Sequence, residues 1–285
     1  MGSLEWGADE NRVSNARLRL AFARETMFRP RAPLRPILAL VAGAVLVTVL
    51  VGASAAATAG RTACGADVAG NGGYTYAGHQ ATYRGHGVRA TISAVRTPDV
   101  VAGHVAGWVG VGGPGEGPNG EDSWLQVGIA SVPGVEPFLY AEITRGGRYP
   151  QFVLLEEAVP VGESRRVAVL EMGRRPGWWR VWVDGKPATG PIHLRGSSGR
   201  WAPIATAESW NGGQVACNRF SFRFERVSVS YGGGGSWRPF VPGYHFLDGG
   251  YKLRPLAAAP AATGAYTRRL AEGGPLPYAF VASSL

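Results

Sequence analysis

Trp124-Leu-Gln-Val-Gly-Ile129 and Phe138-Leu-Tyr-Ala-Glu-Ile143 are the segments that decide the fold. In both, aliphatic side chains alternate with aromatic, polar or small ones, which is the period of a β-strand with two unlike faces. The same alternation recurs in Val88–Ala94, Val105–Val111, Val167–Val169, Trp179–Val183, Ile204–Trp210 and Phe220–Tyr231. This region shows no sustained helical period, and the 43 glycines and 9 tryptophans of the chain favour strands and turns. We therefore predict an all-β fold, a two-sheet antiparallel β-sandwich.

Two local patterns predict how strands are joined and bent. Asp184-Gly185 is a strong hairpin signal directly after an alternating strand. Farther along, apolar residues occupy even positions up to Phe224 and odd positions from Val227 onward. This change of parity predicts a β-bulge near Glu225-Arg226.

The end of the chain differs in composition from this core. We expect the sandwich to occupy residues 74–231. Gly232-Gly-Gly-Gly-Ser236 reads as a flexible linker. Residues 232–285 read as a Gly-, Pro- and Ala-rich linker and tail without sheet structure, although aromatic residues between Trp237 and Tyr251 would allow its first half to dock on the domain.

An apolar run from Ile37 to Val51 marks an export signal near the start of the chain. Basic residues precede it, and small residues follow it, with Ala53-Ser-Ala55 fitting a cleavage site. We expect a basic cytoplasmic segment over residues 1–35, which a start at Met27 would shorten, and a hydrophobic helix over residues 36–59. That helix is either a cleaved signal peptide or an uncleaved signal anchor. The sandwich is thus expected to be secreted, or anchored to the outer face of the cytoplasmic membrane.

Cys64 and Cys217 are the two cysteines of the chain. In an exported protein, an isolated pair predicts a disulfide bond. The histidines lack the spacing of metal ligands and are expected to be structural: His79, His86, His104, His193 and His245. We therefore predict no metal site. We also predict no dinucleotide cofactor, because prolines rather than a helix follow the glycines of Gly110–Gly115.

The net charge of +9 suggests a polyanionic partner at first sight. Lysine occurs only at Lys186 and Lys252, however, so the positive charge is nearly all arginine. Several of these arginines lie between Arg12 and Arg35, before the export signal. The sequence also lacks the interleaved basic and aromatic motif of an RNA-binding sheet. We expect a monomer that does not bind nucleic acid.

Three predicted strands carry a face that mixes aromatic side chains with carboxamide or carboxylate groups. The residues on these faces are Trp124 and Gln126, then Phe138, Tyr140 and Glu142, then Thr206, Glu208 and Trp210. A concave sheet lined in this way is a candidate binding cleft. The alternative is a solvated outer face with scattered aromatic residues.

Four motifs, taken in order, resemble the core of the glutamic peptidases, the eqolisin family. They are Gly107-Trp-Val-Gly-Val-Gly-Gly113, Trp124-Leu-Gln-Val-Gly-Ile129, Tyr140-Ala-Glu142 and Ala207-Glu-Ser-Trp210. The resemblance covers roughly residues 83–231. It implies a concanavalin-like jelly roll that cleaves peptides, best in acid, with a Gln and a Glu facing each other across a concave cleft.

By motif, Gln126 and Glu208 correspond to the catalytic pair, and Trp108 and Glu142 to residues that line the cleft. The chemistry is sound for these residue types. A carboxylate can take a proton from the water that attacks the amide and return it to the leaving nitrogen. A neutral carboxamide opposite can donate a hydrogen bond to the oxyanion.

Two other functions are compatible with the same sequence. A non-catalytic, lectin-like module of the cell envelope would hold a glycan or a peptide with Trp108, Trp124, Tyr140 and Trp210. An envelope structural protein would interact through its aromatic tail. Hydrolysis requires that the Gln126 amide and the Glu208 carboxylate converge across one cleft, within about one water's reach, and it is excluded if the two residues lie on different sheets or on opposite faces.

Overall fold

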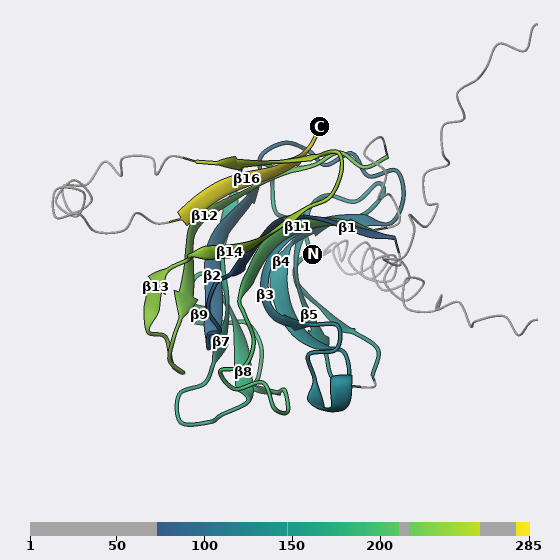
Figure 1. Ribbon diagram of the computed structural model, residues 1–285. Coiled ribbons are helices and arrows are strands. Elements are labelled where there is room, and N and C mark those ends of the chain that lie inside the picture. The colour runs from purple at the N-terminus through teal and green to yellow at the C-terminus, as the bar shows by residue number, and fades with distance from the viewer. Residues whose placement is uncertain (1–72, 147, 211–216, 257–277) are drawn as a thin grey trace, which may run out of the picture. The chain divides into compact units, whose positions relative to one another are not determined.

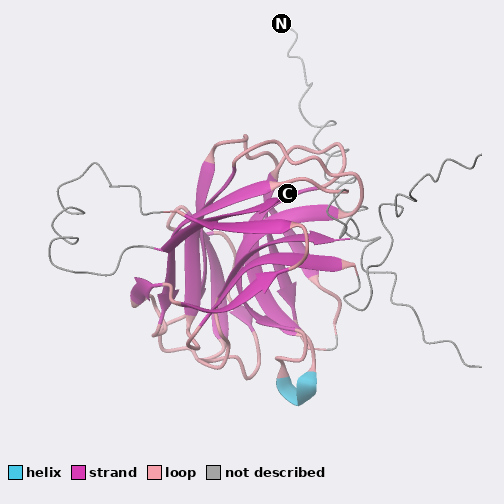
Figure 2. Ribbon diagram, turned by 45° about the horizontal axis from the view of Figure 1, so that its top comes forward, coloured by secondary structure: helices cyan, strands magenta, loops and turns pink. Residues whose placement is uncertain are grey.

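The computed structural model describes residues 73–146, 148–210, 217–256 and 278–285, all within the compact unit Cys64–Leu285. Strands dominate these ranges, and their one helical element is the 3₁₀ turn η1 (Pro118–Gly120) (Figure 2). The hydrophobic segment 36–59 lies outside the described residues. Within those residues, no helix has the length and apolar character needed to cross a bilayer.

The strands form two antiparallel sheets packed face to face, so the predicted two-sheet antiparallel β-sandwich is confirmed (Figure 1). The seven-stranded sheet has the spatial order β14 (Pro242–Leu247), β1 (Tyr74–Ala81), β11 (Ile204–Trp210), β3 (His104–Gly113), β4 (Ser123–Ser131), β5 (Phe138–Thr144) and β6 (Gln151–Glu156).

The nine-stranded sheet has the order β10 (Ile192–His193), β8 (Trp178–Val183), β7 (Ser164–Glu171), β2 (Gly87–Ala94), β12 (Ser221–Ser230), β16 (Tyr278–Ser284) and β15 (Tyr251–Pro255). Two short strands complete it: β9 (Lys186–Pro187) pairs with β8, and β13 (Trp237–Pro239) pairs with β12.

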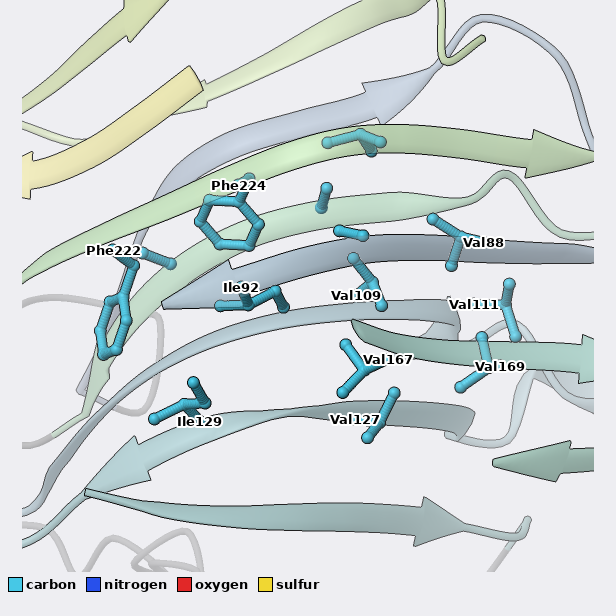
Figure 3. Close-up of a cluster of buried hydrophobic side chains, with 14 of the residues drawn as sticks. Val88, Ile92, Val109, Val111, Val127, Ile129, Val167, Val169, Phe222 and Phe224 are labelled. Carbon is cyan, nitrogen blue, oxygen red and sulfur yellow. The ribbon is translucent and has the colours of Figure 1, made fainter. Parts of the chain in front are cut away.

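The hydrophobic core lies between the two sheets. Val109 of β3 and Val127 of β4 meet Ile92 of β2 and Val167 of β7 there (Figure 3). All four side chains are fully buried, and each contributes roughly 1.5–3 kcal/mol by leaving water. Because side chains alternate along a strand, burying the odd positions of β3 and β4 turns their even positions away from the core.

Both predicted local features are confirmed. Asp184 and Gly185 have φ angles of 48° and 84°, the left-handed pair that a two-residue hairpin between β8 and β9 requires. Arg226 has a φ of 52°, and the pairing of β12 with both β2 and β16 shifts register at this point. The bulge lets β12 bury phenylalanines before it and valines after it.

The expectation of a tail without sheet structure is wrong. Residues 237–255 and 278–284 form β13 to β16. β14 extends the seven-stranded sheet beyond β1, and β16 lies between β12 and β15. The reason is aromatic burial, since Phe240, Tyr251 and Phe280 are 3%, 6% and 0% exposed.

The Gly-rich segment before β13 is a turn rather than a free linker. The Gly234 amide donates to the Glu171 carbonyl at 2.9 Å, and the Gly235 amide donates to the Gly232 carbonyl at 3.3 Å. Glycines at 234 and 235 adopt φ angles of 85° and 105°, which other residues rarely adopt. The same composition that suggests flexibility thus supplies the tight reversal between β12 and β13.

Candidate functional site

Strand register places Gln126 and Glu208 on one face of the seven-stranded sheet. Glu208 of β11 lies opposite Ala106 of β3, and Gln126 of β4 lies opposite Gly110 of β3. Positions 106 and 110 share parity, so both side chains project to the same side. Val109 projects into the core, so the pair lies on the face that points away from the nine-stranded sheet, here called the outer face.

Gln126 is held by Tyr140 of the neighbouring strand. Its Nε2 donates to the Tyr140 hydroxyl at 3.0 Å. The Tyr140 ring stacks on Phe152 of β6, with centroids 5.5 Å apart and planes 13° apart. Tyr140 is 2% exposed and Gln126 is 7% exposed, so the carboxamide is fixed rather than free in solvent.

Electrostatic coupling joins this pair to the two carboxylates. Burial raises the pKa of Tyr140 well above its ordinary value, and the charges of Glu208 and Glu142 raise that pKa further. Burial and the same two carboxylates, together with Asp248, also raise the pKa of Tyr76 on β1. Glu208, Glu142, Tyr140 and Gln126 therefore share one electrostatic environment on the outer face.

Glu208 has a close partner in His104, a residue that was predicted from the sequence to be structural. His104, the first residue of β3, places Nε2 at 3.2 Å from the Glu208 carboxylate, and both side chains are almost fully buried. The imidazole stacks on Trp210 at 5.9 Å and meets Tyr74 edge-on at 6.0 Å. Only the register of β3 against β11 reveals this pair, because 104 positions separate the two residues.

Glu142 lies directly opposite Gln126 in the pairing of β4 with β5. Its carboxylate accepts the Trp124 indole N–H at 2.8 Å. Both side chains are half-buried. Trp124 and Glu142 thus form a wall at one end of the outer face, whereas Trp210 lies beside His104 at the other.

Trp108 occupies the middle of the face, between the strands of Gln126 and Glu208. It is 8% exposed, and its indole N–H has no hydrogen-bond partner among the described residues. Trp108 lies opposite Gly128, where an added Cβ would stand 2.6 Å from the Trp108 Cα. This close approach explains the glycine of the Leu-Gln-Val-Gly motif, and the indole N–H of Trp108 is buried beneath the surface of the face.

All seven residues proposed from sequence therefore lie on one face: Trp108, Trp124, Gln126, Tyr140, Glu142, Glu208 and Trp210. Tyr74 and Tyr76 of β1 extend the aromatic lining, with stacked rings 6.1 Å apart. In the described ranges, no group of three or more His, Cys, Asp or Glu residues is arranged to hold a metal ion.

The described part of the chain does not test the predicted disulfide between Cys64 and Cys217. Cys217 is buried, with 3% of its surface exposed. Cys64 lies outside the described residues, so its pairing with Cys217 stays a prediction.

No family model matches the chain, and no curated protein does. Solved structures with similar architecture include scytalido-glutamic peptidase with a peptide-based transition-state analogue, at 11% identity and a TM-score of 0.43, covering 74% of this chain and 97% of that one. SCP-B, a member of the eqolisin family in complex with a tripeptide, gives 12% identity and the same coverages and TM-score. The Bacillus licheniformis β-glucanase gives 16% identity, a TM-score of 0.30 and coverages of 47% and 56%. These similarities assign no activity to the chain.

Proposed function

We propose that this chain is a glutamic-type endopeptidase in which Glu208 and Gln126 hydrolyse peptide bonds. One observation carries the proposal: Gln126, Tyr140 and Glu208 lie on the same face of one sheet, with Gln126 bonded to Tyr140 and Tyr140 within the field of Glu208. Had the two residues faced opposite sides, no single substrate could contact both.

Glu208 is proposed as the general base and then the general acid. Its carboxylate takes a proton from a water molecule as the water oxygen attacks the amide carbon. The same proton then goes to the leaving nitrogen as the C–N bond breaks, which restores the carboxylate. His104, at 3.2 Å, would orient the carboxylate and is proposed as a positioning residue.

Gln126 is proposed to stabilise the oxyanion. One N–H of its amide is engaged by the Tyr140 hydroxyl at 3.0 Å, and the other N–H can donate to the developing negative charge. Since Tyr140 accepts from Gln126, its own hydroxyl proton can serve as a second donor. The raised pKa of Tyr140, caused mainly by burial, keeps that proton in place at neutral pH.

The test is cleavage of a peptide library by the purified protein from about pH 2 to pH 7, comparing wild type with Glu208→Gln. The substitution preserves size and hydrogen-bonding capacity but cannot carry the proton, so activity should fall by roughly 10²–10⁴-fold or more. Gln126→Ala should cost about 10²–10³-fold. Glu142→Gln is the matched control and should cost less, because Glu142 holds Trp124 instead. Full activity in Glu208→Gln would exclude the assignment.

A binding module is the second candidate, and the aromatic lining of the outer face favours it. Tyr74 lies within ring-contact distance of both Tyr76 and Trp210. Such surfaces suit glycans and peptides alike. Retained peptide or glycan binding with no cleavage at any pH would support this candidate.

Export forms part of the same proposal. The apolar run Ile37–Val51 and the small residues after it support a chain that acts outside the cytoplasm, free or membrane-anchored. N-terminal sequencing of the protein recovered outside the cell would distinguish cleavage after Ala55 from an intact anchor.

A further inference from the structure

Arginines gather around η1, away from Gln126 and Glu208, and line two adjoining cavities. The first cavity, about 530 Å³, is lined by Arg84, Arg195 and Arg200. The second, about 470 Å³, is lined by Arg145, Arg148 and again Arg195. We call these five residues the arginine corner.

The positive charge of the corner is only partly offset. One acidic residue lines each cavity: Glu116 the first and Glu121 the second. Within the described part of the chain, no corner arginine forms an ion pair. Arg145 alone donates to a side chain, the Gln151 carbonyl at 3.1 Å. The guanidinium groups therefore remain available to an external anion.

The first cavity is held in shape by one buried tryptophan. Trp201 is 1% exposed and stacks on Trp179 at 6.2 Å. Its indole N–H donates to the Glu116 carbonyl at 3.0 Å, and its own carbonyl accepts the Gly85 amide at 3.0 Å. The segments that carry Arg84, Glu116 and Arg200 are thus joined at a single residue. A ligand would meet positions that are already ordered, which lowers the entropic cost of binding.

The loop that carries Arg195, the arginine that lines both cavities, is also held by buried hydrogen bonds. Ser197 is fully buried and accepts the Trp179 indole N–H at 2.8 Å. Its hydroxyl donates to the Leu194 carbonyl at 2.7 Å, which closes the loop that carries Arg195. Arg195 itself is exposed and lines both cavities.

The second cavity lies at the rim of the sandwich, where the start of β4 in one sheet comes near His193 of β10 in the other. Ser123, the first residue of β4, lines it, and so does Arg145, which directly follows β5. Ser123 is three residues before Gln126, a separation of about 10 Å along a strand. Since odd positions of β4 face the core side, a peptide that crosses Gln126 and Trp124 on the outer face would have to bend over the edge of the sheet to reach the corner with its next residues.

We propose that the arginine corner binds the carboxylates of acidic residues in a peptide and so makes this chain selective for acidic peptides. Arginine's planar fork matches a carboxylate with two parallel hydrogen bonds. Two cavities on either side of Arg195 suit two such groups along one chain. The choice of a peptide as the ligand rests on the proposed function.

The experiment measures binding by the full chain carrying Glu208→Gln, so that hydrolysis does not consume the probe. The probes are a short fluorescent peptide rich in Glu and the same peptide with Gln at each Glu. We expect the acidic peptide to bind at least about tenfold more tightly at low salt, with the difference shrinking as salt rises. Arg195→Gln should reduce that preference by about threefold to tenfold.

Arg238→Gln is the control, because Arg238 is an exposed arginine on β13 that lines neither cavity. It removes the same charge and should leave the preference unchanged. Equal affinity for the two peptides, or an equal loss in both variants, would overturn the proposal. An oligouronate that binds through Arg195 while the acidic peptide does not would also overturn it, in favour of a glycan ligand. Absence of cleavage in the wild type would count only against the proposed function, because the binding assay requires no hydrolysis.

Discussion

Tyr140 is the residue on which the contacts of the outer face converge. Its ring fills the space beside Phe152, and its hydroxyl fixes the carboxamide of Gln126. Burial and the two nearby carboxylates keep its pKa high. A single side chain therefore positions one proposed catalytic group and lies within the electrostatic field of the other.

Tyr140→Phe should lower the rate of peptide cleavage by about 10–100-fold, because Gln126 loses its anchor and the site loses a donor. The stacked ring remains, so the free energy of unfolding should fall by only about 1 kcal/mol. Steady-state kinetics and urea unfolding measure the two effects. Unchanged kcat in a folded variant would show that the hydroxyl has no part in the reaction.

His104 offers a second test at the scale of one residue. His104→Phe keeps the ring beside Trp210 but removes the nitrogen next to Glu208, so kcat should fall about tenfold, equivalent to 1.4 kcal/mol, with KM unchanged. His104→Gln retains a donor and should recover most of the activity. Equal losses in the two variants would indicate a packing role instead.

Among the elements, β14 shows how an edge strand is attached. It pairs with β1, and His245 on β14 lies opposite His79 on β1. The Nδ1 atoms of the two rings are 2.7 Å apart, and His79 Nε2 lies 2.9 Å from the Tyr278 hydroxyl on β16. One hydrogen-bonded chain thus connects the edge of the seven-stranded sheet to the nine-stranded sheet.

This attachment should weaken in acid. Burial, and then the neighbouring charge of His245, lowers the pKa of His79 to about 4 from its ordinary value of 6.5. Between these values the unfolded chain binds more protons than the folded one, so stability is full above pH 6.5 and falls as the pH drops toward 4. The loss should be about 2 kcal/mol, below the full linkage value because the pair is partly screened by solvent.

Urea unfolding of wild type and His79→Gln at pH 7 and pH 4 measures this loss. The variant lacks the titrating group, so its stability should change less over the same interval. His245→Gln should show an intermediate change, because it removes only the neighbouring charge. Parallel pH dependence in wild type and His79→Gln would refute the assignment.

For the whole molecule, the C-terminal strand closes the sandwich. β16 pairs with both β12 and β15, and Phe280 stacks on Phe224 with centroids 4.6 Å apart and planes 6° apart. Phe280 is fully buried. The last residues of the chain therefore belong to the same folding unit as β2 and β12.

Phe280→Ala should cost about 3–5 kcal/mol of folding free energy, through lost transfer energy and the cavity left behind. Leu285→Ala, five residues later and at a side chain that is 59% exposed, should stay within about 0.5 kcal/mol of wild type. Denaturant unfolding of both variants provides the comparison. A Phe280→Ala protein as stable as wild type would mean that β16 is dispensable.

Local patterns in the sequence predicted the fold class, the hairpin at Asp184-Gly185, the bulge at Arg226 and the face on which Gln126 lies. Each of these follows from local chemistry: side chains in a strand alternate, and left-handed turn positions favour particular residues. Alternation also grouped Trp124, Tyr140 and Glu142 correctly, since parity decides the face of a strand before any strand is paired.

Which strands are neighbours became evident only from the three-dimensional structure. Strands β1 and β6 and the four strands after residue 236 escaped prediction because their alternation is short or broken by Gly and Pro, and they are stabilised by partners distant in sequence. The pairing of His104 with Glu208 and the convergence of five arginines around η1 depend on register and loop packing. Such contacts arise from long-range packing of the whole chain, and no local pattern in the sequence encodes them.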